Sequence, residues 1–327
     1  MKDIFYNICK QFNLGNLLEE TKVLTGGFMH KMYSLNTESG KYAIKLLNPY
    51  VMERKDALQN YENAEKLEEI LLNNNIPVIV PIKFNNKKMQ KINNQFFYIF
   101  NWCNGVKLNK DEIKQYHCEE IGNILAKIHK IDLKEEDCKL DKVNIDWEFY
   151  LTKLKSKNQN IYNILNENIK ILNNFQEDYN NILNEVPKIK SICHNDMDIK
   201  NVLWENNDCY IIDLECLRYS NPFIELLELS LCWSGYEQCN IDFNLFISFI
   251  KSYIQAGGNK PINWKVIYEV NIYRIHWLEF NIKRLLGIEG SEDEEELAIS
   301  EIINTLKQIC YYYNMKDTIL DVLNNKL

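Results

Sequence analysis

Glycine and proline are scarce in this sequence, with 11 and 6 residues among 327. A chain with so few of both is neither collagen-like nor a disordered Pro/Gly-rich segment. Long hydrophobic runs are also missing, since no window approaches the roughly 18 apolar residues that a membrane helix needs. Residues 1–7 lack the cationic start and apolar run of a secretory signal. We therefore expect a cytoplasmic protein without a membrane partner, long enough for two sizeable lobes.

The 10 cysteines form no C-x-x-C pair and no Cys/His cluster at zinc spacing. Without an export signal, scattered cysteines indicate reduced thiols rather than a disulfide framework. A surplus of basic residues is missing as well: the net charge is −8, which argues against a nucleic-acid partner. An acidic balance suits a cationic substrate, although moderately acidic soluble proteins are common.

Hydrophobic periodicity divides the chain into a strand-rich part and a helical part. Strands are expected near residues 22–24, 32–36, 42–47, 78–80 and 96–100, with a helix from about 56 to 72. Helices are expected at 111–129, over a long region from about 147 to 183, and from Pro222 onward. The pattern predicts a bilobal α+β fold. Its parts are a small β-rich N-terminal lobe at 1–100, a hinge connector at 101–105 and a larger, mainly α-helical C-terminal lobe at 106–327.

The segment from residue 193 to residue 215 is the most informative one. It contains the pattern H-x-D-x-x-x-x-N, formed by His194, Asp196 and Asn201, and Asp213 then follows a short apolar strand. Transfer of a γ-phosphoryl group needs a carboxylate that orients the attacking hydroxyl and oxygen ligands that hold Mg²⁺ against the phosphates. Asp196 is the candidate catalytic carboxylate, and Asn201 and Asp213 are the candidate metal ligands. A helix-capping aspartate alone would not require the two later residues.

Four neighbouring side chains support this site in ways that the sequence leaves open. His194 is expected to brace the loop rather than to react, because nothing nearby supplies a nucleophile for it to activate. Glu215 either assists a second metal ion or simply ends the strand. Asp198 contacts the substrate or the loop backbone, and Lys200 lies next to the site without being a required part of it.

Lys45 is a lone lysine in an apolar strand, and a buried ammonium group needs an anionic partner. The alternative is an edge-strand lysine that reaches water. Gly26 and Gly27 form a tight turn upstream, through which the backbone could approach phosphate oxygens. The helix that follows carries Glu62 and Glu65, and either can fix the lysine on the nucleotide phosphates. We favour Glu65.

Several separate pieces share their order and spacing with one known family. They are Gly26-Gly27 before a hairpin, Ala43-Ile44-Lys45, a helix Glu before Ile76-Pro77-Val78, the connector ending at Gly105, the segment 121–129, and the segments 194–201 and 212–215. Over nearly the whole chain the sequence thus resembles the aminoglycoside phosphotransferase and choline kinase family. These are small-molecule kinases with a protein-kinase-like fold, so the resemblance implies the same fold here.

The resemblance also implies a role for each matching position. The implied roles are the catalytic aspartate for Asp196, Mg²⁺ ligands for Asn201 and Asp213, the phosphate-binding lysine for Lys45, and adenine contacts for the backbone at Asn101, Trp102 and Cys103. The chain departs from the family pattern at two positions, since Asp198 replaces a common His and Glu225 a common Asp. No Ala-Pro-Glu follows the Asp213 region, which counts against a protein substrate.

The acceptor site is the part that the sequence describes least. Trp233, Tyr236, Tyr273 and Trp277 are candidates for an aromatic wall against a quaternary ammonium or a sugar face, although core packing is the usual role of such residues. The acidic run at 292–296 either attracts a polyamine-like molecule or begins a solvated helix.

We therefore expect a phosphotransferase that uses ATP or GTP with Mg²⁺. We expect its acceptor to be a hydroxyl of a small, amine-bearing molecule, such as an aminoglycoside-type antibiotic. A choline- or ethanolamine-type kinase is the alternative activity. A catalytically silent, kinase-like binding protein is the alternative from another class.

Overall fold

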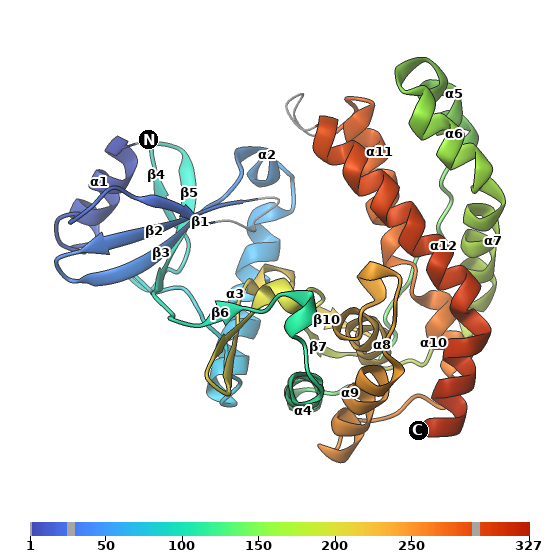
Figure 1. Cartoon of the computed structure of the whole chain (residues 1–327). Coiled ribbons are helices and arrows are strands. Elements are labelled where there is room, and N and C mark those ends of the chain that lie inside the picture. The colour runs from blue at the N-terminus through green and yellow to red at the C-terminus, as the bar shows by residue number, and fades with distance from the viewer. Residues whose placement is uncertain (1, 25–29, 290–294) are drawn as a thin grey trace. The chain divides into compact units, whose positions relative to one another are not determined.

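The computed structural model describes residues 2–24, 30–289 and 295–327. The chain forms two compact units, each of which is built from two stretches of sequence (Figure 1). Unit 1 contains residues 1–109 and 194–218, and unit 2 contains residues 110–193 and 219–327. The sequence predicted a single change of lobe at 101–105, whereas the structure returns the segment with the phosphotransfer motif to the first unit.

Unit 1 begins with a helix, α1 (Lys2–Gln11), and a five-stranded antiparallel sheet. The sheet has the order β1-β2-β3-β5-β4, with β1 at Lys22–Leu24, β2 at Lys31–Thr37, β3 at Gly40–Leu46, β4 at Gln90–Ile92 and β5 at Gln95–Asn101. Gly40 opens β3 with a φ of 143°, a conformation that side chains disfavour and that lets β2 and β3 join through a tight turn. The short helix α2 (Pro49–Met52) and the longer α3 (Ala57–Asn73) follow β3.

The two faces of this sheet pack against different groups of side chains. One cluster contains Phe5 and Ile8 of α1 together with Ile44 and Leu46 of β3. Because side chains alternate across a strand, Lys45 points to the opposite face. Tyr98, its partner in the β3–β5 register, lies on that same opposite face and packs with Tyr61 of α3. The alternation of β3 therefore aims Lys45 at α3.

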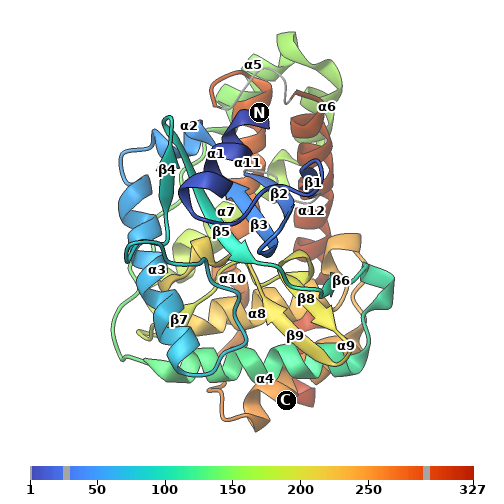
Figure 2. The same cartoon turned by 90° about the vertical axis from the view of Figure 1, so that its left-hand side faces the viewer.

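A second, three-stranded sheet in unit 1 contains a hairpin that lies between Asn201 and Asp213 of the motif in the chain order. Its order is β6-β8-β9, with β6 at Val106–Lys107, β8 at Val202–Glu205 and β9 at Asp208–Ile211 (Figure 2). Single 3-10 turns flank the hairpin, η3 (Ile199–Asn201) before it and η4 (Leu214–Cys216) after it. Ile79 N–H donates to Ile211 O at 2.9 Å, which ties the end of β9 to the segment after α3.

Unit 2 is mainly helical. Its helices are α4 (Gln115–Ile131), α5 (Trp147–Lys157), α6 (Gln159–Glu167), α7 (Ile169–Ile182), α8 (Pro222–Trp233), α9 (Phe243–Gln255), α10 (Trp264–Val270), α11 (Tyr273–Leu285) and α12 (Glu295–Lys326). Three 3-10 turns accompany them, η1 (Lys110–Glu112), η2 (Leu183–Glu185) and η5 (Tyr236–Gln238). The short strand β7 (Ser191–Cys193) pairs with β10 (Arg218–Ser220).

Side-chain caps set several of these helix boundaries. Asp146 accepts from Phe149 N–H at the start of α5, and Asp242 accepts from Asn244 N–H at the start of α9. Gly122 lets α4 and α9 approach closely, since a Cβ there would lie 2.4 Å from Phe249 O.

The antiparallel sheet near the N-terminus and the mainly helical remainder confirm the α+β class predicted from the sequence. Within the described ranges, no helix combines the length and the apolarity that a membrane crossing requires.

Candidate active site

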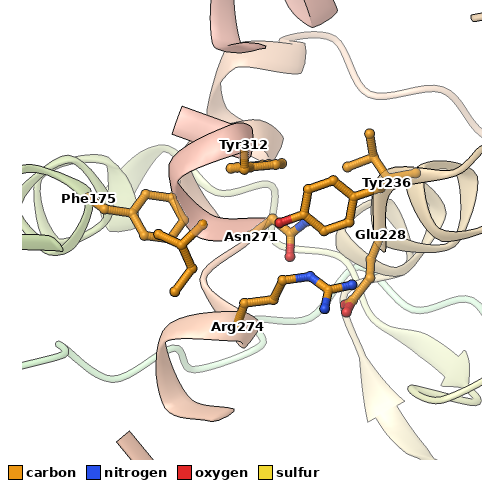
Figure 3. Close-up of a pocket in the computed structure, with 8 residues that line it drawn as sticks. Phe175, Glu228, Tyr236, Asn271, Arg274 and Tyr312 are labelled. Carbon is orange, nitrogen blue, oxygen red and sulfur yellow. The ribbon is translucent and has the colours of Figure 1, made fainter. Parts of the chain in front are cut away.

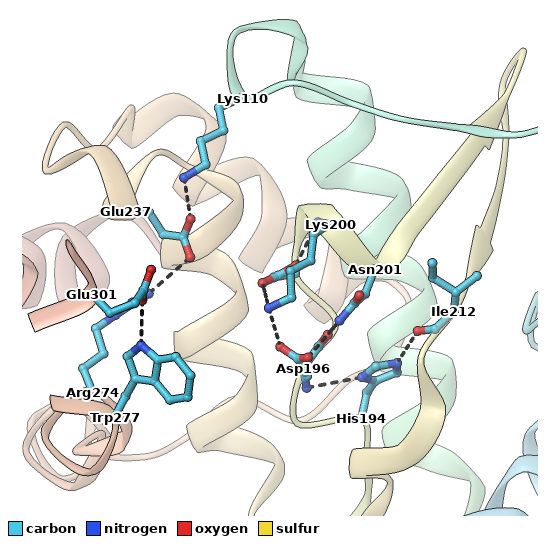
Figure 4. Close-up of polar contacts among 11 residues, drawn as sticks. Lys110, His194, Asp196, Lys200, Asn201, Ile212, Glu237, Arg274, Trp277 and Glu301 are labelled. Atoms are coloured by element: carbon cyan, nitrogen blue, oxygen red, sulfur yellow. Dashed lines mark hydrogen bonds and ion pairs between the residues drawn. The ribbon is translucent and has the colours of Figure 1, made fainter. Parts of the chain in front are cut away.

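Asp196 lies in the loop between β7 and η3 and is held from two sides (Figure 4). Asn201 Nδ2 donates to Asp196 Oδ2 at 2.9 Å and to Asp196 O at 2.8 Å. Lys200 Nζ donates to the other carboxylate oxygen, Oδ1, at 3.2 Å. Burial raises the pKa of Asp196 to about 6, although the charge of Lys200 acts in the opposite direction. The carboxylate is thus fixed in orientation and is a proton acceptor near neutral pH.

His194 connects this loop to the strand that precedes Asp213. Its Nδ1 accepts from Asp196 N–H at 3.2 Å, so the ring proton is on Nε2, which lies 3.3 Å from Ile212 O. The adjacent Asn195 has a φ of 61°, a left-handed conformation that Asn tolerates. Asn195 Nδ2 donates to Cys216 O at 3.1 Å. These contacts all go to backbone atoms, as in a side chain that braces a loop.

Asp198 and Lys200 form an ion pair beside Asp196. Asp198 caps η3 by accepting from Lys200 N–H at 2.8 Å, and its other oxygen lies 2.7 Å from Lys200 Nζ. Burial alone lowers the pKa of Lys200, but the charges of Asp196 and Asp198 raise the pKa above its usual value. Lys200 is therefore bound to both carboxylates of the loop, a contact that the sequence did not predict.

Lys45 is 7% exposed and pairs with two carboxylates of unit 1. Its Nζ lies 2.5 Å from Asp213 Oδ1 and 2.5 Å from Glu215 Oε2. Burial lowers the pKa of a lysine, but these two charges raise the pKa of Lys45 above its usual value. Burial likewise raises the pKa of Glu215, yet Lys45 and His30 bring it down to about 2. Both members of the Lys45–Glu215 pair are therefore charged at neutral pH.

The expected pairing of Lys45 with Glu65 is not formed among the described residues. Glu65 instead accepts from Tyr98 Oη at 2.9 Å, and Glu62 is exposed. The α3 side chain that reaches the lysine's partners is Tyr61, whose hydroxyl lies 3.4 Å from Glu215 Oε2. Glu65 lies one turn further along the same helix face, about 6 Å away, and this displacement directs it to Tyr98.

The side-chain oxygens of Asn201 and Asp213 are suitable ligands for a hard divalent cation. Both amide hydrogen bonds of Asn201 use its nitrogen, so its carbonyl oxygen is the atom that it offers to a ligand. Asp213 has a φ of 63° and offers a carboxylate. Mg²⁺ prefers oxygen ligands of these two kinds, so the set suits the cation that the sequence predicted.

The other predicted nucleotide contacts lie in two places. Gly26 and Gly27 fall outside the described residues. Asn101 ends β5, and the N–H of Trp102 donates to Lys41 O at 3.2 Å. The Trp102 ring lies 3.5 Å from Lys41 Nζ, which covers one face of the indole.

Cys103 Sγ accepts from Gly105 N–H at 3.3 Å, which closes a turn after Trp102. The Trp102 N–H, the Trp102 ring and Cys103 Sγ are thus all used for contacts within unit 1. The assignment of Asn101, Trp102 and Cys103 to adenine stays a prediction.

The predicted aromatic acceptor contacts of unit 2 differ in accessibility. Trp233 is 0% exposed and packs in the core, which corrects its assignment to the substrate. Tyr236 is buried too, and the Arg274 guanidinium lies 4.5 Å from its ring centroid (Figure 3). The cavity beside this pair is about 10 Å³, room for about one water molecule. Trp277 is half-buried, with Nε1 donating to Glu301 Oε2 at 2.9 Å, and Tyr273 is exposed.

Comparisons with known proteins give a family and a fold for the chain. The comparison with curated protein sequences returns no match. The model of the Phosphotransferase enzyme family matches residues 20–267.

Several solved structures have the same fold. A spectinomycin phosphotransferase in complex with ADP and spectinomycin has a TM-score of 0.62 at 15% identity, covering 99% of this chain and 98% of that one. An amicoumacin kinase in complex with AMP-PNP and Ca²⁺ has a TM-score of 0.61 at 12% identity, with coverages of 92% and 93%. An ethanolamine kinase of Plasmodium vivax has a TM-score of 0.57 at 18% identity, with coverages of 91% and 84%. The chain therefore belongs to the Phosphotransferase enzyme family, and its fold is that of small-molecule kinases.

Proposed function

We propose that this protein transfers the γ-phosphoryl group of ATP or GTP to a hydroxyl group of a small, amine-bearing molecule, with Mg²⁺ as cofactor. One observation carries the proposal: the candidate catalytic carboxylate, metal ligands and phosphate lysine belong to one connected set of contacts in unit 1. Asn201 joins Asp196 at 2.9 Å, and Lys45 joins Asp213 at 2.5 Å. The backbone links the two pairs, because Ile212 N–H donates to Asn201 O at 2.9 Å.

Each of these side chains has a distinct part in the reaction. Asp196 orients the acceptor hydroxyl and accepts its proton late in the transfer. The acceptor oxygen bonds to the γ-phosphorus while the bond from that phosphorus to the bridging oxygen breaks, and its electron pair leaves with the nucleoside diphosphate. Lys45 holds the donor phosphates. Mg²⁺ held by Asn201 and Asp213 would offset the negative charge of the phosphate oxygens.

The distribution of charge favours a cationic acceptor. Unit 1 contains 16 Lys and Arg and 16 Asp and Glu, whereas unit 2 contains 22 and 30. The whole acidic surplus of the chain therefore belongs to the helical unit. Acidic surfaces raise the local concentration of cationic ligands, as an amine-bearing acceptor would require.

A choline- or ethanolamine-type kinase is the second candidate. The likeness to the ethanolamine kinase of Plasmodium vivax supports it, because that protein's named acceptor is also a small amino alcohol. The Tyr236 ring argues against a quaternary ammonium cage at that position, since the Arg274 guanidinium already lies over it. Tyr273 and Trp277 are the predicted aromatic contacts that keep exposed surface in unit 2.

An acceptor panel tests the proposal. The purified protein is incubated with Mg²⁺ and either ATP or GTP, together with aminoglycosides, other amine-bearing antibiotics, choline and ethanolamine. Nucleoside diphosphate release and the mass of the phosphorylated product are measured. We expect release that depends on one class of amine-bearing alcohol. Failure of every such acceptor with both nucleotides would contradict the proposal.

Asp196→Asn is the control for this panel. The amide keeps the size of the side chain but removes the proton acceptor. It keeps one of the two carboxylate contacts, because its NH2 group cannot accept a hydrogen bond from Asn201 Nδ2 or from Lys200 Nζ. Turnover should fall by about 10²-fold or more, as general-base losses usually do. Binding of the Mg²⁺ nucleotide, measured by thermal shift, should change little. A variant that turns over at the wild-type rate would exclude Asp196 as the catalytic carboxylate.

A further inference from the structure

A buried chain of polar groups runs from the start of β2 to the phosphate lysine. His30 Nε2 lies 3.0 Å from Tyr61 Oη and 3.3 Å from Glu215 Oε2, and Tyr61 Oη lies 3.4 Å from Glu215 Oε2. Glu215 Oε2 in turn lies 2.5 Å from Lys45 Nζ. His30, Tyr61 and Lys45 are 6%, 7% and 7% exposed, so water competes little for these contacts.

The hydrogen-bond partners fix the direction of this chain. Asn48 N–H donates to His30 Nδ1 at 2.9 Å, so Nδ1 carries no proton and the neutral ring has its proton on Nε2. His30 Nε2–H then faces both the Tyr61 oxygen and Glu215 Oε2, and the Tyr61 hydroxyl donates its own proton to Glu215. Every donor in this chain of hydrogen bonds faces an acceptor. The chain of hydrogen bonds ends at Glu215, the carboxylate that pairs with Lys45.

We propose that Tyr61 and His30 are positioning residues that hold Lys45 on the donor phosphates by way of Glu215, in place of a helix glutamate. This inference rests on the proposed function and deepens it. Helix α3 supports Lys45 through the neutral hydroxyl of Tyr61, because Glu65 of the same helix accepts a hydrogen bond from Tyr98 Oη at 2.9 Å.

Two features make Glu215 the partner that needs support. Asp213 is also the candidate metal ligand, so its contact with Lys45 competes with that role, whereas the Glu215 contact does not. Glu215 lies in η4, a single 3-10 turn with no regular helix to hold it. Its link to Tyr61 attaches this turn to the longer and better-packed α3.

Tyr61→Phe tests the inference, and Tyr98→Phe is its matched control. Both changes remove one buried hydroxyl that bonds a glutamate, but the Tyr98 hydroxyl bonds Glu65 and not the partner of Lys45. We measure kcat, KM for nucleotide and acceptor, and Tm. Tyr61→Phe should lower kcat/KM for the nucleotide by about tenfold, the usual loss for a hydrogen bond to a charged group, and leave the acceptor KM nearly unchanged. Tyr98→Phe should lower Tm about as much as Tyr61→Phe does, but it should leave kcat/KM for the nucleotide near the wild-type value. Equal kinetics in the two variants would overturn the inference.

A double-mutant cycle separates action through Glu215 from a direct effect. If Tyr61 acts through Glu215, the change to Phe should cost little once Glu215 is Gln. Fully additive losses would contradict this route.

Variants of His30 extend the test to the start of the chain of contacts. His30→Leu should reproduce the nucleotide defect, and His30→Gln, which keeps an N–H donor, should restore part of it. A His30→Leu enzyme with wild-type nucleotide kinetics would remove His30 from the proposal.

The readout also distinguishes this inference from the proposed function. If the wild-type protein phosphorylates no acceptor, the proposed function fails. The positioning role is then tested by binding, through the dissociation constants of the Mg²⁺ nucleotide measured for the same variants. Weaker binding in Tyr61→Phe than in Tyr98→Phe would then support it. Equal binding would contradict it.

Discussion

Lys200 shows how one side chain can change the charge balance of the loop that holds Asp196 and Asp198. Its ammonium lies 3.2 Å from Asp196 Oδ1 and 2.7 Å from Asp198 Oδ2. Without it, two adjacent carboxylates would face the anionic donor phosphates. We therefore expect Lys200→Met to lower kcat by about tenfold, less than the loss of a fully buried transition-state contact because the pair is partly exposed.

Steady-state kinetics check this prediction with two further variants. Lys200→Arg keeps the charge and should restore most of kcat. Lys83→Met removes a lysine of unit 1 that pairs with Glu69 at 3.0 Å, and it should behave like wild type. A Lys200→Met enzyme with unchanged kcat would show that turnover does not require an ion pair to the carboxylates of Asp196 and Asp198.

Spacing within one segment was enough to select the residues that the structure brings together around Asp196. The interval from Asp196 to Asn201, followed by Asp213, is a local pattern that a sequence displays directly. The α3 residue that contacts the partner of Lys45 is different, because its identity depends on the helical phase of α3 to within one turn. Tyr61 belongs to the apolar stripe of that helix and differs from an ordinary core tyrosine only through its contact with Glu215.

At the scale of elements, periodicity predicted most regular segments, but the strand expected near 78–80 is only an isolated bridge between Val78 and Ile211. The interruptions of the helices were predicted poorly. The helix expected at 56–72 is α3 at Ala57–Asn73. The long helical region expected at 147–183 is instead three helices, α5, α6 and α7. Asn158 begins α6 by accepting from Ile161 N–H at 3.1 Å, and Asn168 separates α6 from α7. In a sequence so rich in asparagine, the capping residues cannot be told from the exposed ones by type alone.

One buried cluster joins several elements of unit 2. His129 of α4 lies 2.8 Å from Glu225 of α8 and 3.0 Å from the Tyr253 hydroxyl of α9. Removing one partner of a buried pair leaves the other unsatisfied, so Glu225→Ala should lower the free energy of unfolding by about 3 kcal/mol. Glu225→Gln keeps a hydrogen-bonding group and should cost about 1 kcal/mol.

Denaturant unfolding measures both values for the Glu225 variants. Glu136→Ala, at an exposed ion pair with Lys190, serves as the control and should leave the unfolding free energy near that of wild type. If Glu225→Ala matched this control, the buried pair would not stabilise the helices that it joins.

The whole molecule separates its charges by unit, and this separation predicts a salt effect that no single contact explains. The net charge of −8 falls entirely on unit 2, while unit 1 is balanced. Added salt screens attraction between exposed charges, with a Debye length that falls from about 10 Å at 0.1 M to about 3 Å at 1 M. The KM for a cationic acceptor should therefore rise about threefold or more over this range of salt.

The matched comparison is an uncharged analogue of the same acceptor, assayed at the same nucleotide concentration. Its KM should stay nearly constant with salt, because no long-range attraction is lost. Both acceptors share the chemical step, so a change in kcat common to both would report a general effect of salt on the enzyme. If the KM for the cationic acceptor did not change with salt concentration, contacts within the site would select the substrate, and the acidic surplus of the helical unit would not.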